Sequence, residues 1–347
     1  MGEAIPHPPS GFRVDEDRWE VEALDGGSSV RSLAESALLA AITVLLMFLG
    51  AFLPIAGFFV VLMWPIPVML VILRHGVRYG LMTVAVTIVL STIFLGIIQA
   101  VLAGITIVGL IGVAFGIGLR RSWTGSTLVG VGTAVIAVSF LITLALAGPL
   151  MGIDLVEQIQ NTAARSVEMA AETYSSMGVA DAELILEEMR TAIAIMETVF
   201  PAMLMMSAFV YSVWTFGVTR LLLPKLGYAV PPLPPFARWR APIWLALALL
   251  ASYGIILFMG GPESVSYIVV LAENVLFAAN GAYLVFGAAL LYFLLHRLLG
   301  SPWVAGFACA LIAINPIGVS ILPLAAILDS GLDIRRFVDR KRNENRT

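Results

Sequence analysis

Long apolar runs, separated by short polar or basic segments, make up most of the chain. A transmembrane helix needs roughly 20 apolar residues with few charges, and an isolated surface helix alternates apolar and polar residues instead. The runs of about that length cover residues 33–53, 55–73, 81–95, 97–119, 128–150, 199–222, 241–259 and 267–298. A further apolar stretch, 302–328, is interrupted at Asn315-Pro316. We therefore predict an all-α fold: a polytopic integral membrane helical bundle of about eight spans plus a broken C-terminal hydrophobic element.

The second run contains Trp64, Pro65 and Pro67 and is not expected to form a regular helix. Each proline lacks an N–H and clashes with the preceding helical turn. The carbonyls freed in this way are costly in hydrocarbon unless protein or a water-lined cavity satisfies them. Two interpretations stay open: a packed kink, or part of a ligand-binding site near the membrane midplane.

Small residues predict close helix contacts at two places. Ala37 and Ala41 are four residues apart in the first run, so they share a helix face. That face either packs against this protein's own helices or docks a partner subunit. In the fourth run, Gly112 and Gly116 form a GxxxG pair, which indicates a close helix crossing rather than catalysis.

The segment 152–198 differs from the rest because it carries nine acidic residues and two basic ones. Its apolar residues still recur at helical spacing, Gly178 divides it, and Asp181 suits an N-cap for the second half. We predict an amphipathic helical hairpin that lies against the membrane surface or leads into the next span. It would be either a solvated cap or a lid over a cavity.

Basic residues concentrate on the cytoplasmic side of membrane proteins, so their distribution predicts orientation. With the N-terminus inside, the basic groups at 74–78, 120–121, 225–240 and 297 fall inside, and the acidic segment falls outside. A turn at Asn315-Pro316 keeps the basic tail inside as well. The alternatives for the number of spans are a single ninth span at 302–328 or a split of 267–298 into two segments. The predicted regions are a disordered cytoplasmic tail (1–31), a five-span region (32–150), an extracytoplasmic segment (151–198), a C-terminal membrane region (199–330) and a basic cytoplasmic tail (331–347). The predicted location is the bacterial cytoplasmic (inner) membrane.

Composition agrees with this class and excludes several others. Charged residues make up 12% of the chain, about half the share in soluble domains, so the main solvent is lipid. The net charge of −3 gives no reason to expect nucleic acid as a partner. The single cysteine, Cys309, rules out an intrachain disulfide and is expected to be a small buried apolar residue.

Motifs for catalysis or metal binding are missing from the sequence. Neither of the two lysines, Lys225 and Lys341, stands in a Gly-Lys-Ser/Thr sequence, so the chain is not a P-loop ATPase. The histidines, His7, His75 and His296, lie far apart and form no HExxH motif. We therefore expect no catalytic residues, no metal site and no cofactor, and we expect that the chain is not an enzyme.

The remaining candidates are polar residues at membrane depth. Glu273 and Asn274 lie inside the run 267–298, and Asn280 follows seven residues after Glu273, on nearly the same helix face. A carboxylate there costs about 2.5–3.5 kcal/mol on insertion scales and should be paired, protonated or facing a cavity. Glu273, Asn280 and Asn315, with Trp64, Pro65 and Pro67, are the predicted ligand-binding residues. The alternative is interhelical hydrogen bonding that only stabilises the bundle.

Motifs near both ends resemble the YybS-like family of uncharacterised bacterial membrane proteins. They are Glu35-Ser36-Ala37, Pro65-Ile66-Pro67, Arg74-His75-Gly76, Ile327-Leu328-Asp329 and Asp333-Ile334-Arg335-Arg336. That family is similar in turn to the S components of energy-coupling-factor vitamin transporters. These bind a small-molecule cargo and dock onto a transmembrane coupling subunit that works with ATPases in separate chains. The resemblance implies that Ala37 and Ala41 contact that partner. The chain departs from S components in having more than six spans and the acidic segment.

Two hypotheses follow for function. In the first, the chain is a solute-binding or transport component with a small-molecule cargo. In the second, it is a membrane interaction or scaffold protein that does not transport. A pocket containing Glu273 that opens outward would favour the first hypothesis, and a Glu273 sealed in a hydrogen bond would favour the second.

Overall fold

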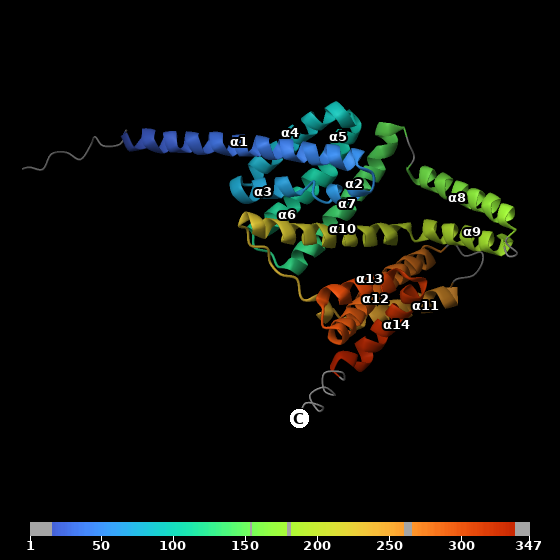
Figure 1. Ribbon diagram of the computed structural model, residues 1–347. Coiled ribbons are helices and arrows are strands. Elements are labelled where there is room, and N and C mark those ends of the chain that lie inside the picture. The colour runs from blue at the N-terminus through green and yellow to red at the C-terminus, as the bar shows by residue number, and fades with distance from the viewer. Residues whose placement is uncertain (1–15, 153–154, 179–181, 260–265, 337–347) are drawn as a thin grey trace, which may run out of the picture. The chain divides into compact units, whose positions relative to one another are not determined.

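The computed structural model describes residues 16–152, 155–178, 182–259 and 266–336. Within these residues the fold is all-helical, as predicted (Figure 1). The chain divides into an N-terminal unit, Met1–Arg120, and a C-terminal unit, Arg121–Thr347. Each unit is described by itself below.

The helices of the N-terminal unit are α1 (Glu16–Phe52), α2 (Pro54–Val61), α3 (Ile66–His75), α4 (Val77–Leu95), α5 (Ile97–Ala103), a π-helical stretch (Gly104–Ile111) and α6 (Gly112–Arg120). Helix α1 begins at Glu16, well inside the segment 1–31 that the sequence predicted as a tail. The described part of that segment, from Glu16 on, therefore differs from the prediction of disorder.

The predicted break in the second span is confirmed, because α2 ends at Val61 and α3 begins at Ile66. Backbone groups in the break pair locally: Met63 donates to Val60, and Ile66 donates to Met63. Helix α3 then forms the centre of the unit, with every residue from Ile66 to Ile72 buried. Helix α6 packs on it at the GxxxG pair, where Gly112 meets Val68 and Gly116 meets Ile72, so the predicted close crossing is confirmed.

Helix α1 packs along α4 and α3 with one face only. Ser36, Ala40, Thr43 and Met47 are buried at spacings of three or four residues, which define this inner face. Thr43 donates to the carbonyl of Leu39, so its hydroxyl is satisfied within the helix.

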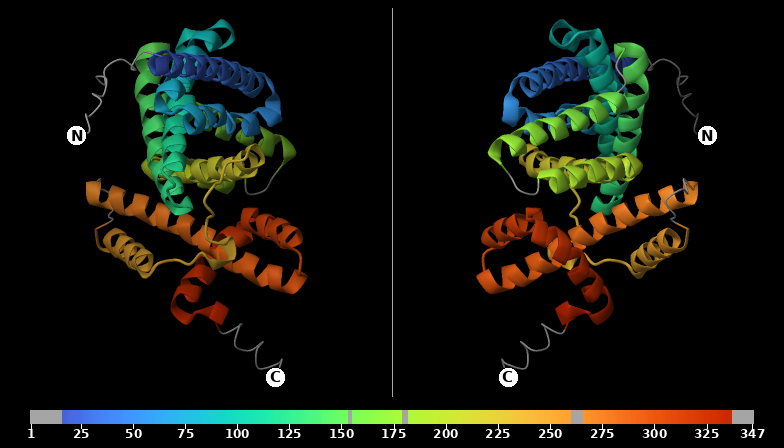
Figure 2. Two further views of the ribbon diagram at one scale, coloured as in Figure 1. Left: turned by 90° about the vertical axis from the view of Figure 1, so that its left-hand side faces the viewer. Right: turned by 90° about the vertical axis from the view of Figure 1, so that its right-hand side faces the viewer.

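The elements of the C-terminal unit are α7 (Gly125–Met151), α8 (Leu155–Met177), α9 (Ala182–Thr198), α10 (Phe200–Leu222), two 3-10 turns (Leu223–Leu226 and Phe236–Arg238), α11 (Ile243–Met259), α12 (Tyr267–Leu299), α13 (Pro302–Ile314) and α14 (Pro316–Leu332). Helices α7 and α10 pack together, and α12 contacts α10, α11, α13 and α14. Figure 2 shows α11, α13 and α14 lying around the long helix α12.

Three predicted features of this unit are confirmed. Residues 267–299 form one continuous helix of 33 residues, so that run is not split. Helices α13 and α14 bend by 105° at Asn315, where Pro316 cannot continue the α13 hydrogen-bond ladder. The acidic segment forms a helical hairpin from α8 and α9, and Gly178 ends α8 at a φ of +66°. Asp181, the predicted N-cap, lies outside the described residues.

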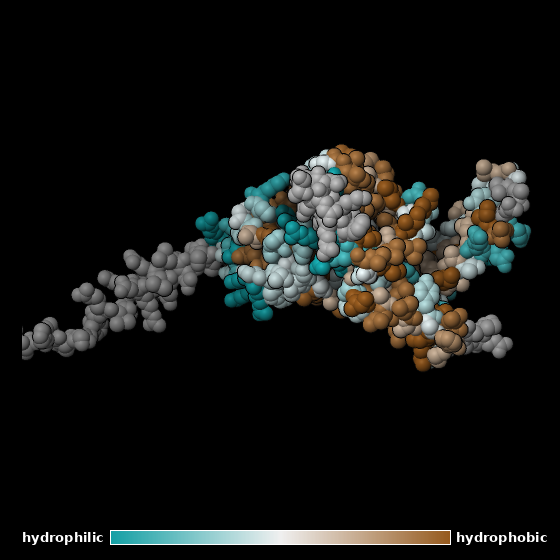
Figure 3. All heavy atoms as spheres, turned by 90° about the horizontal axis from the view of Figure 1, so that it is seen from below, coloured by the Kyte–Doolittle hydropathy of each residue, from teal (hydrophilic) through white to brown (hydrophobic). Residues whose placement is uncertain are grey.

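Seven helices in the described part are long and apolar enough to cross a membrane, and the bent pair would make eight. Helix α11 has 17 residues, or about 26 Å, which is shorter than the hydrocarbon core of about 30 Å. The face drawn in Figure 3 carries broad hydrophobic areas, as expected for helices that meet lipid.

Candidate functional site

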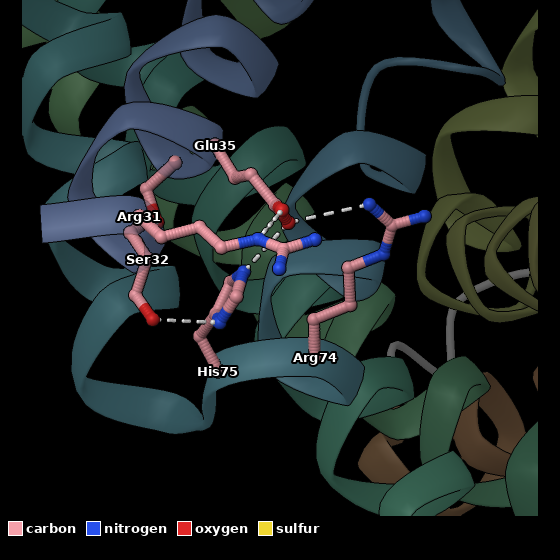
Figure 4. Close-up of polar contacts among 6 residues, drawn as sticks. Arg31, Ser32, Glu35, Arg74 and His75 are labelled. Atoms are coloured by element: carbon pink, nitrogen blue, oxygen red, sulfur yellow. Dashed lines mark hydrogen bonds and ion pairs between the residues drawn. The ribbon is translucent and has the colours of Figure 1, made fainter. Parts of the chain in front are cut away.

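The ion pairs of the described residues concentrate in two clusters. The first, here called the Glu35 cluster, comprises Arg31, Ser32, Glu35, Arg74 and His75 (Figure 4). Glu35 Oε2 lies 2.9 Å from His75 Nε2 and 3.3 Å from Arg74 Nη1, and Glu35 Oε1 lies 3.1 Å from Arg31 Nε. The Ser32 hydroxyl lies 2.9 Å from His75 Nδ1. One carboxylate thus joins the start of the apolar part of α1 to the end of α3.

Local structure explains why these side chains meet. Ser32 and Glu35 are three residues apart in α1 and so share a face. Arg74 and His75 form the last turn of α3, where basic groups complement the helix dipole. Gly76, at a φ of +94°, then ends α3 and starts α4. Glu35 is also the only acidic residue between Asp25 and Asp154, so the cluster holds the one carboxylate of the five-span region.

A serine hydroxyl, an imidazole and a carboxylate, linked in this order, also form the catalytic triad of serine hydrolases. In the neutral tautomer that fits these distances, His75 Nε2–H donates to Glu35 and Nδ1 accepts from Ser32. However, Ser32 lies within the regular helix α1, whose N–H groups are engaged in helical hydrogen bonds. Those groups are therefore not available to stabilise an oxyanion, and the geometry serves helix-to-helix attachment.

The second cluster, here called the Asp329 cluster, lies at the end of α14. Arg335 Nε is 3.1 Å from Asp329 Oδ2, and these side chains are 4% and 5% exposed. The Arg335 guanidinium also donates to the carbonyls of Ala237 and Trp239, the latter at 2.8 Å. Arg335 therefore joins the loop at Ala237 and Trp239 to the end of α14, where Asp329 pairs with its charge.

Asp333 extends this cluster with two exposed partners. It lies 2.8 Å from Arg240 Nη2 and 2.8 Å from Arg336 Nε. Burial by itself raises the pKa of the Asp333 carboxyl, but the hydrogen bond and charge of Arg240, with the charge of Arg336, outweigh it. The net pKa lies below the ordinary value of 3.8. The carboxylate is thus held in its charged form.

The predicted ligand-binding residues of the second span lie in the core of the N-terminal unit. Trp64, Pro65 and Pro67 are buried, and the Trp64 indole N–H donates to the carbonyl of Leu46 at 2.9 Å. Trp64 also packs against Gly50, where a Cβ would lie 2.8 Å from the ring. The second span is thus packed at its kink, and the ligand-binding role of these three residues stays a prediction.

In the C-terminal unit, Glu273 and Asn280 are half-buried on α12, and Asn315 is exposed. The Asn315 side chain accepts from Ile317 N at 3.0 Å and so caps α14. No hydrogen bond or ion pair joins Glu273 to another residue in the described part of the chain. The polar group at Glu273 is therefore neither sealed in a hydrogen bond nor placed in the cavity described below. The three residues form no common contact, and their ligand-binding role stays a prediction.

Asn274, the neighbour of Glu273, repairs a helix break. Its Oδ1 accepts from Ala202 N at 3.0 Å, and its Nδ2 donates to Thr198 O at 2.8 Å. These two backbone groups are four residues apart and would pair with each other in an unbroken helix. The side chain of Asn274 therefore takes the place of the missing bond where α9 gives way to α10.

Ala37 and Ala41 are both exposed within the N-terminal unit, on a flank of α1 beside the buried face that contains Ser36, Ala40 and Thr43. Packing inside this unit therefore does not use the predicted small-residue face. The adjoining outer surface of α1 carries larger apolar residues, including Leu38 and Leu45.

A small cavity of about 120 Å³ lies in the acidic hairpin and the start of α10. Its lining residues are Ile159, Gln160, Ile193, Met196, Glu197 and Phe200. None of the predicted ligand-binding residues lines it. Among the described residues, no group of three or more His, Cys, Asp or Glu side chains is placed to hold a metal ion.

The residues that sequence reasoning missed as a site are the ion-paired ones. Glu35, Asp329 and Arg335 stood out in the sequence only as parts of short motifs, and Arg74 and His75 only as a basic group and an isolated histidine besides. A signal was present, because a single carboxylate in a long apolar region must find a partner. The partner could not be identified, since the pairing joins residues about 40 positions apart.

Comparison with known proteins agrees with the membrane class. Residues 41–330 match the family model described as "Predicted membrane protein (DUF2232)". The chain is 22% identical over 317 residues to "Uncharacterized protein YybS" of Bacillus subtilis (strain 168), which covers 89% of this chain and 98% of that protein. No solved structure matches the chain.

Proposed function

Because the chain belongs to the DUF2232 family of predicted membrane proteins, we propose that it is a multi-pass subunit of a membrane complex that binds its partner through the outer face of α1. The observation that carries this proposal is the division of α1 into two faces. Ser36, Ala40 and Thr43 pack inside the N-terminal unit, whereas Ala37 and Ala41 remain exposed. Small residues on an exposed transmembrane face let another helix approach closely.

The Glu35 cluster supports this role by fixing the rotation of α1. Glu35 lies two residues before Ala37, and its bonds to Arg74 and His75 turn the opposite side of α1 outward. The resemblance to S components suggests the kind of partner, a transmembrane coupling subunit with ATPases in separate chains. Such a partner would supply the nucleotide chemistry for which this sequence has no motif.

The proposed location is the bacterial cytoplasmic membrane, with both termini on the cytoplasmic side. The arginines at the ends of α3 and α6 and the basic loop 225–240 support this orientation, since basic residues are retained on that side. The proposed role needs no catalysis by this chain.

Photocrosslinking in intact cells tests the docking face. A photoreactive amino acid at Ala37 or Ala41 should give a discrete adduct with another membrane protein. The matched control is Ile42, which is 40% exposed and lies about 100° around the helix from Ala41. If Ala37, Ala41 and Ile42 all give lipid adducts and no protein adduct, the proposal is contradicted. As a second readout, Ala41→Trp should abolish the Ala37 adduct, and Ile42→Trp should leave it intact.

The second candidate function is binding of a small solute, and one observation favours it. Glu273 is half-buried in α12, a helix of membrane-spanning length, without a partner in the described residues. An intramembrane carboxylate of this kind is expected to serve a ligand or a proton. The hairpin α8–α9 would then act as an outer lid.

Ligand discovery on purified protein tests this candidate. Co-purifying small molecules are identified by mass spectrometry, and vitamins and related metabolites are screened for their effect on thermal unfolding. A ligand that raises the Tm of the wild type, and that of Glu273→Gln much less, would support solute binding. No such ligand, with equal Tm values for the two proteins, would show that Glu273 is structural.

A further inference from the structure

Arginines outnumber carboxylates at one end of the N-terminal unit. From residue 30 to residue 120 the chain contains Arg31, Arg74, Arg78 and Arg120 but only one acidic residue, Glu35, which leaves a net charge of +3. These arginines come from four helices: α1, α3, α4 and α6. Glu35 pairs with Arg31 and Arg74, so half of this positive charge has a partner.

The other two arginines are placed around Gly76. Arg120, the last residue of α6, lies over Gly76, because a Cβ added to Gly76 would be 2.6 Å from Arg120 Nη1. Arg78 is the second residue of α4, which begins directly after Gly76. Both side chains are exposed, and neither has an ion pair with another described residue. Two unpaired guanidinium groups thus belong to one helix junction, which lies at the cytoplasmic membrane boundary if the orientation proposed above holds.

We propose that Arg78 and Arg120 bind a phosphate group at this junction, either the phosphodiester of an anionic lipid headgroup or a soluble phosphate. A guanidinium presents paired N–H donors that match two phosphate oxygens. Basic sites between transmembrane helices at the cytoplasmic boundary are suited to anionic headgroups. Gly76 has no side chain, which leaves the space that Arg120 occupies. The neighbouring Glu35 is engaged with its own partners and does not neutralise Arg78 or Arg120.

Membrane topology alone also places basic residues at this boundary, and the two explanations differ in one respect. For topology, lysine serves as well as arginine, because only the charge is counted. For bidentate phosphate binding, lysine is a poorer substitute, because its ammonium group is a single point donor. Lysine variants therefore separate a phosphate site from a topological signal.

The experiment uses the full chain, delipidated in neutral detergent and analysed by native mass spectrometry and thermal unfolding. The probes are dioctanoyl phosphatidylglycerol, dioctanoyl phosphatidylcholine and inorganic phosphate. Phosphatidylglycerol should bind and raise the Tm, and phosphatidylcholine should do so much less. The double variant Arg78→Gln/Arg120→Gln should bind at least about tenfold more weakly, since each lost charged hydrogen bond is worth about that factor or more. Arg78→Lys/Arg120→Lys should recover only part of the affinity.

The control is Arg220→Gln, which removes one exposed arginine at the end of α10. It should bind the probe as the wild type does. Preferential binding of inorganic phosphate at the same arginines would identify a soluble phosphate as the ligand. Full affinity in the lysine double variant, equal weakening by Arg220→Gln, or no binding of either phosphate probe would overturn the proposal.

Discussion

The close crossing of α12 and α14 gives a sharp test of the structure, because it depends on one glycine. A Cβ added to Gly287 would lie 2.0 Å from the backbone oxygen of Leu322, where ordinary contact begins at 3.4 Å. Gly287→Ala therefore requires α14 to move by about 1.4 Å, the difference between these two distances. A backbone oxygen cannot rotate away as the end of a side chain can.

The expected cost follows from this displacement. Overpacking a core typically costs 1–3 kcal/mol, and a backbone shift belongs near the upper value, about 3 kcal/mol. Replacing glycine by alanine within a helix returns about 1 kcal/mol through helix propensity. Gly287→Ala should thus destabilise the protein by about 2 kcal/mol, which corresponds to a Tm roughly 4–8 °C lower.

The same helix offers a matched control. A Cβ at Gly281 would meet only the side chain of Met206, with Cε, its far and flexible end, nearest at 2.4 Å. Gly281→Ala should therefore leave the Tm unchanged or slightly higher. A third variant, Gly254→Ala in α11, meets no atom within 4 Å and should be stabilising by up to about 1 kcal/mol.

The chain contains a built-in reporter for this assay. Cys309 is its only cysteine, is buried, and donates to the carbonyl of Ala288 at 3.2 Å, next to Gly287. A thiol-reactive fluorescent dye therefore reports unfolding at the crossing itself. If Gly287→Ala and Gly281→Ala unfold at the same temperature, the close approach of α12 to α14 is wrong.

Three further predictions concern polar contacts of the C-terminal unit. Asp329→Asn or Arg335→Gln should each lower the free energy of unfolding by about 3 kcal/mol, because either variant leaves a buried charge unpaired. The double variant should lose clearly less than the sum of the two single losses in thermal unfolding. Additive losses would show that the two side chains do not interact. Because the pKa of Asp333 is lowered in the folded state, its carboxylate stabilises the fold at pH values above 3.8, the ordinary pKa. This stabilisation is lost as the pH falls through the folded-state pKa. Asp333→Asn should therefore flatten the decline in Tm below about pH 4, and an unchanged pH profile would refute this. Asn274→Ala should lower the free energy of unfolding by about 2 kcal/mol, because two backbone groups lose the side chain that joins them. The rate of amide hydrogen exchange at the α9–α10 junction should rise, and unaltered protection there would contradict this role.

The sequence by itself determined the membrane class, most span boundaries and the places where helices break. The physical reason is that lipid offers no hydrogen bonds, so span length and proline position act locally. The breaks at Pro65 and at Asn315-Pro316 followed from missing N–H groups, and the close contact at Gly112 and Gly116 followed from the absence of side chains.

Only the tertiary structure decided which polar groups meet. Glu35 and His75 are 40 residues apart, and Arg335 reaches carbonyls nearly 100 residues away, so no local spacing predicts either contact. Asn274 shows the same limit, because its partners are freed by a break in another helix. Likewise, the division of α1 between an inner face at Ser36 and an outer face at Ala37 depends on which helices pack beside it. Long-range pairing is set by the packing of whole helices, which periodicity within one segment does not encode.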